Sequence, residues 1–360
     1  MTARRAFTAD PAAERRAGIA ASFAAAGETT GAVSPDQLSI AGTSVSLRFA
    51  SQALRERLTP AFAHLLQAPD AASARPALTI HLWDSASTGA EPPPRPRVPV
   101  NHAPGALYHF HEAPLRGVYR PGLESLSILD SEAGVAWHWV ADAFEQPYWD
   151  EACPIRQILF WWLGSRGYLQ VHGAAVGTSA GGVLLVGKGG SGKSTVALSS
   201  LGSDLLYAGD DYVAVAVEPS PRVQSLYSSG KLEPQHVHEL LPHLMPLLSN
   251  AERLESEKAV IYVQEHFPDQ TTSGFPLRAV LVPRVRAAQR ESRIVEASRA
   301  AAFAALAPST ILQLHTADSK AFEAMAKLIG RVPCHGLEVG SDVSAIPEVI
   351  GNFLAGLSSG

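Results

Sequence analysis

The stretch VHGAAVGTSAGGVLLVGKGGSGKSTVALSSLGSDLLYAGDDYVAV, residues 171–215, contains the residues that decide the fold. Within it, residues 187–195 read GKGGSGKST and match the phosphate-binding pattern G-x-x-x-x-G-K-[ST] completely. An apolar run at 183–186 leads into this segment, and an alanine- and leucine-rich stretch typical of a helix follows it. A phosphate loop needs this order of strand, glycine-rich loop and helix. The sequence therefore predicts a nucleotide site, in preference to a glycine-rich turn that binds no ligand.

The chemistry of a phosphate loop follows from its glycines and its lysine. Glycines let successive backbone N–H groups turn toward a β-phosphate, and the N-terminus of the following helix adds partial positive charge. We expect Lys193 to reach the β- and γ-phosphate oxygens, and the Ser194 hydroxyl to bind Mg²⁺. The residues predicted to bind the nucleotide are Gly187, Lys188, Gly189, Gly190, Ser191, Gly192, Lys193, Ser194 and Thr195.

Two adjacent carboxylates, Asp210 and Asp211, follow Ser194 by sixteen and seventeen residues and lie between two apolar runs. Adjacent acids at the end of a strand repel each other unless a cation or a proton offsets the repulsion. One carboxylate can hold a metal ion, directly or through water, while the other accepts a proton from an attacking hydroxyl. An Asp-Asp pair in an ordinary turn is the alternative, but the distance from the phosphate loop favours the functional interpretation.

Two further residues are candidates for the reaction centre. His172 lies in an apolar strand, where a histidine is usually a core residue, but a neighbouring strand would bring it near the phosphate loop. Lys231 follows a glycine at a predicted loop tip, where a cation could stabilise charge on a transferring phosphoryl group. A solvated turn is equally compatible with Lys231. The chain has only six lysines among 29 basic residues, which favours a specific role for this one.

Other charged residues are weaker candidates. Arg284 and Arg286 could contact phosphates, although scattered surface arginines are the favoured interpretation in an arginine-rich chain. Lys258 lies beside two glutamates and is expected to belong to a surface charge cluster. A histidine cluster lacks the H-E-x-x-H pattern and is interrupted by prolines, so a solvated helix face is favoured over a metal site. Its members are His236, His238, Glu239 and His243.

Composition limits the class of protein. The 360 residues are 46% hydrophobic and 18% charged, which allows a sizeable core and excludes disordered and collagen-like chains. The net charge of −5 gives no basic field for nucleic acid or an anionic membrane. Two cysteines exclude a disulfide-rich scaffold. Since no run of about 18 apolar residues occurs and residues 1–30 lack a signal-peptide core, we expect a cytoplasmic protein.

The pattern of predicted strands and helices changes near residue 150. The first part alternates short apolar strands with a helical pattern at 52–67, and 153–166 reads as an apolar helix leading into the rest. This predicts an α+β domain at 1–150, for substrate recruitment or regulation, and an α/β catalytic domain at 151–360. Strands are expected near 38–49 and at 77–83, 106–111, 125–130 and 135–140, and later helices at 299–306, 319–329 and 343–357.

Residues 169–217 resemble the catalytic core of bacterial HPr kinase/phosphorylase. That family has His-Gly on a strand, a phosphate loop about fifteen residues further on, and an Ala-Asp-Asp sequence beyond it. His172, the loop at 187–194 and the pair at 210–211 keep both spacings. Phosphoenolpyruvate carboxykinase has a related Gly-Asp-Asp arrangement, as at 209–211 here, and is the nearest alternative. The resemblance implies a P-loop kinase core of the HPr kinase/phosphoenolpyruvate carboxykinase type.

The resemblance also implies roles for individual residues. Asp210 would be the base that deprotonates a serine hydroxyl, and Asp211 and Ser194 would hold Mg²⁺. Lys193 would contact the γ-phosphate, and His172 would line the reaction centre. Because adjacent carboxylates titrate as a pair, the division of labour between Asp210 and Asp211 is left open.

One segment departs from the family. Residues 226–240 read LYSSGKLEPQHVHEL where the family has an Arg-Gly-Leu-Gly-like stretch. The pattern is more similar to the HPr-kinase-like proteins of ribosomal-peptide clusters, including lasso peptides, some of which phosphorylate a serine of the precursor peptide. The implied function is ATP- and Mg²⁺-dependent transfer of the γ-phosphoryl group to a hydroxyl, foremost a serine of a peptide or protein. No nucleic acid or membrane partner is expected, and a homo-oligomer is left open. A nucleotide-gated regulatory ATPase, a small-molecule kinase and a carboxykinase-like enzyme are the alternatives.

Overall fold

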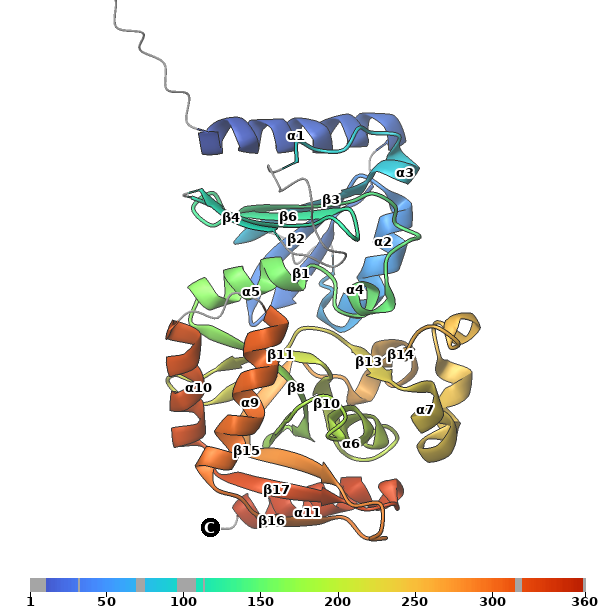
Figure 1. Ribbon diagram of the computed structural model, residues 1–360, viewed down its shortest axis with the longest axis vertical. Coiled ribbons are helices and arrows are strands. Elements are labelled where there is room, and N and C mark those ends of the chain that lie inside the picture. Colours follow the sequence, from blue (N-terminus) through green and yellow to red (C-terminus); the bar gives the residue numbers. More distant parts are fainter. Residues whose placement is uncertain are drawn as a thin grey trace, which may run out of the picture.

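The computed structural model describes residues 11–31, 33–68, 75–95, 108–112, 114–314 and 319–358. The protein is a mixed α/β protein with two large mixed sheets and a separate two-stranded sheet. Figure 1 shows the two large sheets one above the other, with the N-terminal sheet in the upper half. Among the described residues, no helix is both long and apolar enough to cross a membrane.

Residues 36–140 supply a seven-stranded sheet. Its strands are β1 (Asp36–Ile40), β2 (Thr43–Phe49), β3 (Leu78–Asp84), β4 (Tyr108–Glu112), β5 (Leu115–Arg120), β6 (Ser125–Asp130) and β7 (Val135–Val140). They lie in the order β1-β2-β3-β7-β6-β5-β4, with β2–β3 and β3–β7 parallel and the other pairs antiparallel. The strands predicted in this region are confirmed, except that residues 106 and 107 of one lie outside the described residues.

Helices cover both faces of this sheet. Helix α1 (Pro11–Thr30) lies across one face, with Ile19 packed in a cluster that contains Trp83 and Trp139. The sequence did not predict α1 because its apolar residues are mostly alanines without a clear periodicity.

The helix expected at 52–67 is divided into α2 (Gln52–Leu58) and a 3₁₀ helix η1 (Thr59–Leu65). Pro60 lacks the N–H that a continuous α-helix needs, so the chain changes to the tighter helix there.

Residues 168–339 supply the larger sheet. Its strands are β8 (Tyr168–Thr178), β9 (Gly181–Val186), β10 (Leu206–Gly209), β11 (Tyr212–Ala216), β12 (Arg222–Ser225), β15 (Gly274–Val285), β16 (Arg293–Glu296) and β17 (Cys334–Val339). The order is β10-β8-β11-β12-β15-β17-β16, and β9 pairs with both β15 and β8. The pairs β15–β17 and β15–β9 are parallel and the rest are antiparallel.

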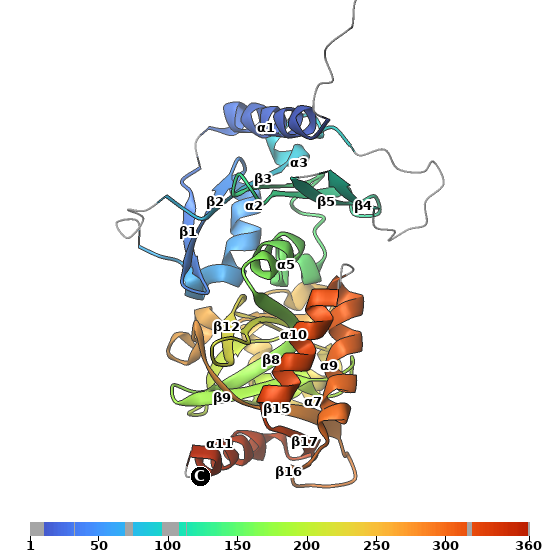
Figure 2. The same cartoon turned by 90° about the vertical axis from the view of Figure 1, so that its left-hand side faces the viewer.

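This sheet also has helices on both faces. Helices α9 (Arg299–Leu314) and α10 (Ser319–Arg331) pack against one face, and α6 (Lys193–Ser199) and α11 (Ile346–Ser358) against the other. Figure 2 shows α9 and α10 side by side along the larger sheet and α11 at its far end. The remaining elements are α3 (Ser85–Thr88), α4 (Tyr148–Ala152), β13 (Ser229–Leu232), α7 (Pro234–Leu240), η3 (Pro242–Leu247), η4 (Ala251–Arg253), β14 (Ala259–Tyr262), α8 (Val263–His266), η5 (Pro268–Gln270) and η6 (Val343–Ala345).

Helix α5 (Arg156–Ser165) connects the two sheets. Trp161 and Trp162 are buried in one hydrophobic cluster with Leu47 of the upper sheet and Tyr212 of the lower one. The tryptophan pair is therefore part of the core, as the sequence indicated, and does not form a binding platform. Because one cluster extends across residue 150, the division into domains at that residue stays a prediction.

Candidate active site

The phosphate loop connects the end of β9 to the start of α6. Gly190 (φ +76°) and Gly192 (φ +101°) adopt backbone conformations that side-chain-bearing residues rarely take. A Cβ atom added to Gly187 would lie only 2.6 Å from Ser191 Oγ. The glycines are thus required by the shape of the loop, and α6 presents its N-terminus to the same space.

Lys193 is held inside this loop. Its Nζ donates to the carbonyl oxygens of Gly187 (2.7 Å) and Lys188 (3.2 Å), so the loop wraps around a buried ammonium group. Burial lowers the pKa of Lys193, while Asp210 and Asp211 oppose that effect. The Ser191 hydroxyl is buried and has no hydrogen-bond partner among the described residues. A phosphate oxygen is the kind of group that such a donor can bind.

Asp210 follows β10 and contacts the start of α6. Its Oδ1 accepts a hydrogen bond from Ser194 Oγ at 3.0 Å, and its Oδ2 accepts one from the backbone N–H of Lys231 at 3.2 Å. The side chain is almost completely buried, with 1% of the residue exposed. Burial, together with the charge of Asp211, raises the pKa of Asp210. A cation at this position would favour the ionised carboxylate.

Asp211 has a different environment. Its Oδ2 pairs with Lys231 Nζ at 2.5 Å and its Oδ1 with His172 Nε2 at 3.0 Å. Burial alone would raise the pKa of Asp211, but Lys231 and His172 outweigh it and keep the pKa well below its usual range. Asp211 also has φ +69°, a left-handed conformation that costs a non-glycine residue about 1–3 kcal/mol. Such local strain is typical of residues that must point in one direction.

Strand pairing explains why these residues meet. In the antiparallel pair β8–β11, His172 lies opposite Tyr212, so its imidazole is next to Asp211. In the hairpin β8–β9, Gly173 lies opposite Val186, where β9 enters the phosphate loop. The structure thus brings His172, predicted from a neighbouring strand, to the edge of the loop.

The prediction for Lys231 needs a correction. Lys231 was expected at a loop tip, but it lies within strand β13, paired with Val260 of β14. Burial would lower the pKa of Lys231, but the ion pair with Asp211 outweighs it and raises the pKa above its usual value. A solvated turn is therefore excluded for this lysine.

A cavity of about 650 Å³ joins these groups. The phosphate loop from Gly189 onward lines it, as do His172, Asp211 and Lys231. Asp210 lies behind Ser194 and is not among the lining residues. Asp211 therefore lines the cavity directly, whereas Asp210 borders it through Ser194.

Sequence reasoning missed several residues at this site. Tyr148, Trp149 and Arg156 line the cavity from α4 and α5, and the Cys153 thiol lies 3.9 Å from Asp211 Oδ2. Burial raises the pKa of Cys153 to about 12, so it is a neutral thiol. No local pattern marks these residues, because they approach the site only through the packing of α5 between the sheets.

The weaker candidates separate into two groups. Arg286 pairs with Glu338 on the surface, and neither Arg284 nor Arg286 lines the cavity. Lys258 pairs with Glu233 at 2.8 Å, and both line the cavity. Of the histidine cluster, His236 and Glu239 line the cavity and the other two members do not.

The donor set fits a magnesium ion. Ser194 Oγ and Asp210 Oδ1 are hard oxygen ligands 3.0 Å apart at the start of α6. Mg²⁺ in nucleotide sites is usually bound by one or two carboxylates together with phosphate oxygens. Ser194 and Asp210 meet this requirement with the phosphate loop beside them.

The buried ion pair makes a prediction about stability. Replacing Lys231 by methionine should lower the free energy of unfolding at pH 7 by about 3 kcal/mol, because Asp211, whose side chain is 23% exposed, would remain as a partly buried charge without its main partner. Without Lys231, the pKa of Asp211 in the folded state rises. The carboxyl group then becomes protonated as pH falls, so the difference from the unmodified protein should shrink between pH 7 and pH 4. Urea unfolding at pH 7, 5 and 4 measures this.

Lys258→Met is the matched control for this experiment. Like Lys231, Lys258 pairs with a carboxylate, that of Glu233, but its side chain is 43% exposed. Its replacement should therefore lower the free energy of unfolding by less than about 1 kcal/mol. A loss for Lys231→Met that is the same at every pH would show that Asp211 does not depend on Lys231 for its charge.

Comparisons with known proteins include a distant structural likeness. No protein-family model matches the chain, and no curated protein matches it. The structure of the Hpr(Ser) kinase/phosphatase from Coxiella burnetii is similar with a TM-score of 0.30 and 11% sequence identity. The similarity covers 52% of this chain and 98% of that chain. This distant structural resemblance assigns no family, so the function is inferred from the contacts of the site itself.

Proposed function

We propose that the protein is an ATP- and Mg²⁺-dependent kinase that transfers the γ-phosphoryl group to a hydroxyl, most readily a serine of a peptide or protein. One observation carries the proposal. A single cavity is lined by the phosphate loop from Gly189 onward, including its lysine, and by an ionised carboxylate fixed by a lysine and a histidine. Phosphoryl transfer requires this combination of a phosphate cradle and an oriented acceptor for the hydroxyl proton.

Ser194 and Asp210 would hold the magnesium ion. Asp210 contacts Ser194 directly, and a cation there would offset the burial and the repulsion by Asp211 that raise the pKa of Asp210. Mg²⁺ in such a site neutralises charge on the phosphates. Lys193, at the centre of the loop, would bind the β- and γ-phosphate oxygens through its ammonium group.

Asp211 would act on the acceptor hydroxyl. The hydroxyl oxygen forms a bond to the γ-phosphorus, the bond between the γ-phosphorus and the bridging oxygen breaks, and ADP leaves. The proton of the hydroxyl passes to Asp211 late in the reaction, when bonding to phosphorus has made it acidic enough for a carboxylate of low pKa. His172 and Lys231 hold that carboxylate in place. This division exchanges the roles that the family resemblance implies for the two aspartates. It is favoured because Asp211 lines the cavity and Asp210 does not.

A test of the function uses three sets of peptides that differ only in the central residue. Purified protein is incubated with MgATP and peptides centred on serine, threonine or alanine, and intact masses are recorded. We expect one phosphate on serine peptides, less on threonine peptides and none on alanine peptides. ATP consumption without a phosphorylated peptide would contradict the proposal and favour a small-molecule acceptor or a nucleotide-gated switch.

A further inference from the structure

A second cavity lies under the seven-stranded sheet. It has a volume of about 440 Å³ and is enclosed by β5, β6 and β7 of that sheet together with α2, α4 and α5. We call it the sheet cavity. None of the phosphate-loop residues lines it, and the kinase chemistry proposed above does not use it.

The walls of the sheet cavity suit an apolar group. Six aliphatic side chains line it, namely Leu54, Leu58, Val118, Leu123, Val140 and Ile155. Four of the polar residues that line it are hydrogen-bonded in two pairs. His138 Nδ1 and Ser127 Oγ are 2.9 Å apart, and Arg120 Nη1 donates to Asp150 Oδ2 at 2.7 Å. Burial lowers the pKa of His138 to about 4, so this imidazole is neutral at physiological pH.

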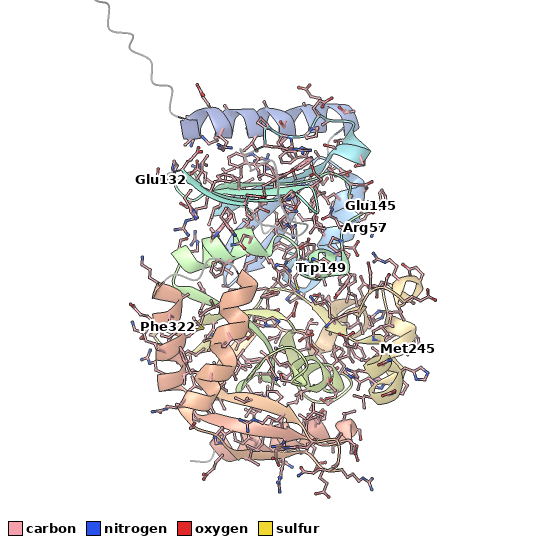
Figure 3. The ribbon with its side chains drawn as sticks, in the orientation of Figure 1. Arg57, Glu132, Glu145, Trp149, Met245 and Phe322 are labelled. Atoms are coloured by element: carbon pink, nitrogen blue, oxygen red, sulfur yellow. The ribbon has the colours of Figure 1, made fainter. Side chains whose placement is uncertain are left out.

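Two residues belong to both cavities. Trp149 and Arg156 line the sheet cavity and also the cavity that contains Asp211 and the phosphate loop. Trp149 is 37% exposed, and five residues before it Phe144 is 60% exposed. Figure 3 shows Trp149 at the junction between the upper and lower halves of the molecule, below Arg57 and Glu145. A ligand in contact with both Trp149 and Arg156 would therefore touch the walls of both cavities.

Arg156 favours an extended peptide as that ligand. Its guanidinium group has five N–H donors, and its ion pair with Asp150 spans 3.8 Å through a single nitrogen. The guanidinium also lies over the Tyr212 ring, 5.8 Å from its centroid. Because Arg156 lines both cavities, a peptide segment that contacts both would bring a backbone carbonyl group toward its donors. A peptide can also place a serine hydroxyl in the cavity that contains Asp211 and an apolar side chain in the sheet cavity.

We propose that the sheet cavity binds a bulky apolar side chain of the acceptor peptide, close in sequence to the phosphorylated serine. The inference rests on the proposed kinase function and deepens it, because it names the feature by which the acceptor is recognised. Removing a buried leucine or phenylalanine side chain from the peptide should weaken binding by about tenfold or more.

The test measures binding and transfer separately. Serine peptides with leucine, phenylalanine, alanine or aspartate at each of the two positions on either side of the serine are used as substrates. Fluorescein-labelled copies with alanine in place of serine report binding by anisotropy, which needs no chemistry. Leu123→Trp fills the sheet cavity from its half-buried rim, and Leu123→Ala enlarges it. Leu66→Trp, at an exposed leucine that lines neither cavity, is the matched control.

We expect a preference of about tenfold or more for leucine or phenylalanine at one position, in both binding and transfer. Leu123→Trp should abolish the preference, Leu123→Ala should shift it toward the larger side chain, and Leu66→Trp should retain it.

Phosphate transfer without an apolar preference, or a preference that both Leu123 variants retain, would overturn this inference and leave the kinase function intact. Binding with the expected preference but no transfer would support the sheet cavity and refute the kinase function. Binding of free leucine amide as tight as that of the peptide would show a small-molecule site instead.

Discussion

Replacing Asp211 by asparagine is expected to lower kcat for phosphate transfer by about 10²–10⁴-fold, the range typical of losing a positioned general base. Asparagine keeps the shape of the side chain and can still accept a hydrogen bond from Lys231, but it cannot take the proton of the hydroxyl. The affinity for MgATP should change by less than about threefold, because Asp211 is not part of the phosphate loop and is not assigned to the magnesium ion. Steady-state kinetics and equilibrium titration of MgATP measure the two effects separately.

Asp210→Asn is the matched comparison, since it makes the same change one residue earlier. Asp210 contacts Ser194, so its replacement should raise the Mg²⁺ concentration needed for half-maximal activity and weaken MgATP binding. If Asp210→Asn lowers kcat without altering the Mg²⁺ dependence while Asp211→Asn alters it, the two roles are the reverse of those proposed here.

Lys193→Ala is expected to have the second large effect. The Nζ atom of Lys193 lies at the centre of the phosphate loop, where its charge binds the β- and γ-phosphates. Its loss should weaken MgATP binding by about 100-fold and lower kcat/KM by about 10³-fold, because the charge that binds these phosphates is removed. Each factor of ten corresponds to about 1.4 kcal/mol. Calorimetric titration with MgATP and peptide kinetics provide the measurements.

The control for Lys193→Ala is Lys327→Ala, which removes an exposed lysine from α10. It should leave both quantities within about twofold of the original values. MgATP affinity in Lys193→Ala equal to that of the unmodified protein would show that the loop does not bind the nucleotide phosphates.

The parts of the site that are local in sequence could be predicted from it. The phosphate loop needs its glycines for positive φ and its lysine for charge, so nine consecutive residues identify it. His172 and Asp211 could be placed near the loop because short strands and hairpins bring their ends together. The helices of the larger sheet were predictable in place from their apolar periodicity, but not in extent. Helix α9 continues to Leu314 where 299–306 was predicted, and residues 343–345 form η6 ahead of α11.

The rest depends on contacts between distant segments. Asp211 has a left-handed φ, and Asp210 and Asp211 therefore have different surroundings. The sequence Asp-Asp does not indicate this difference. Lys231 reaches Asp211 because β13 pairs with β14 and is buried, which a Ser-Gly-Lys sequence does not indicate. Arg156 and Trp149 enter the site through α4 and α5, whose placement is set by the hydrophobic cluster shared by both sheets.

The most direct test of the central claim is to follow the γ-phosphoryl group of MgATP by ³¹P NMR in the presence of a serine peptide. The structure predicts that the γ-phosphate signal is lost as a phosphoserine signal grows in equal amount, and that neither change occurs with Lys193→Ala. Appearance of inorganic phosphate at the same rate with and without the peptide would contradict the account, because the cavity would then direct the phosphoryl group to water.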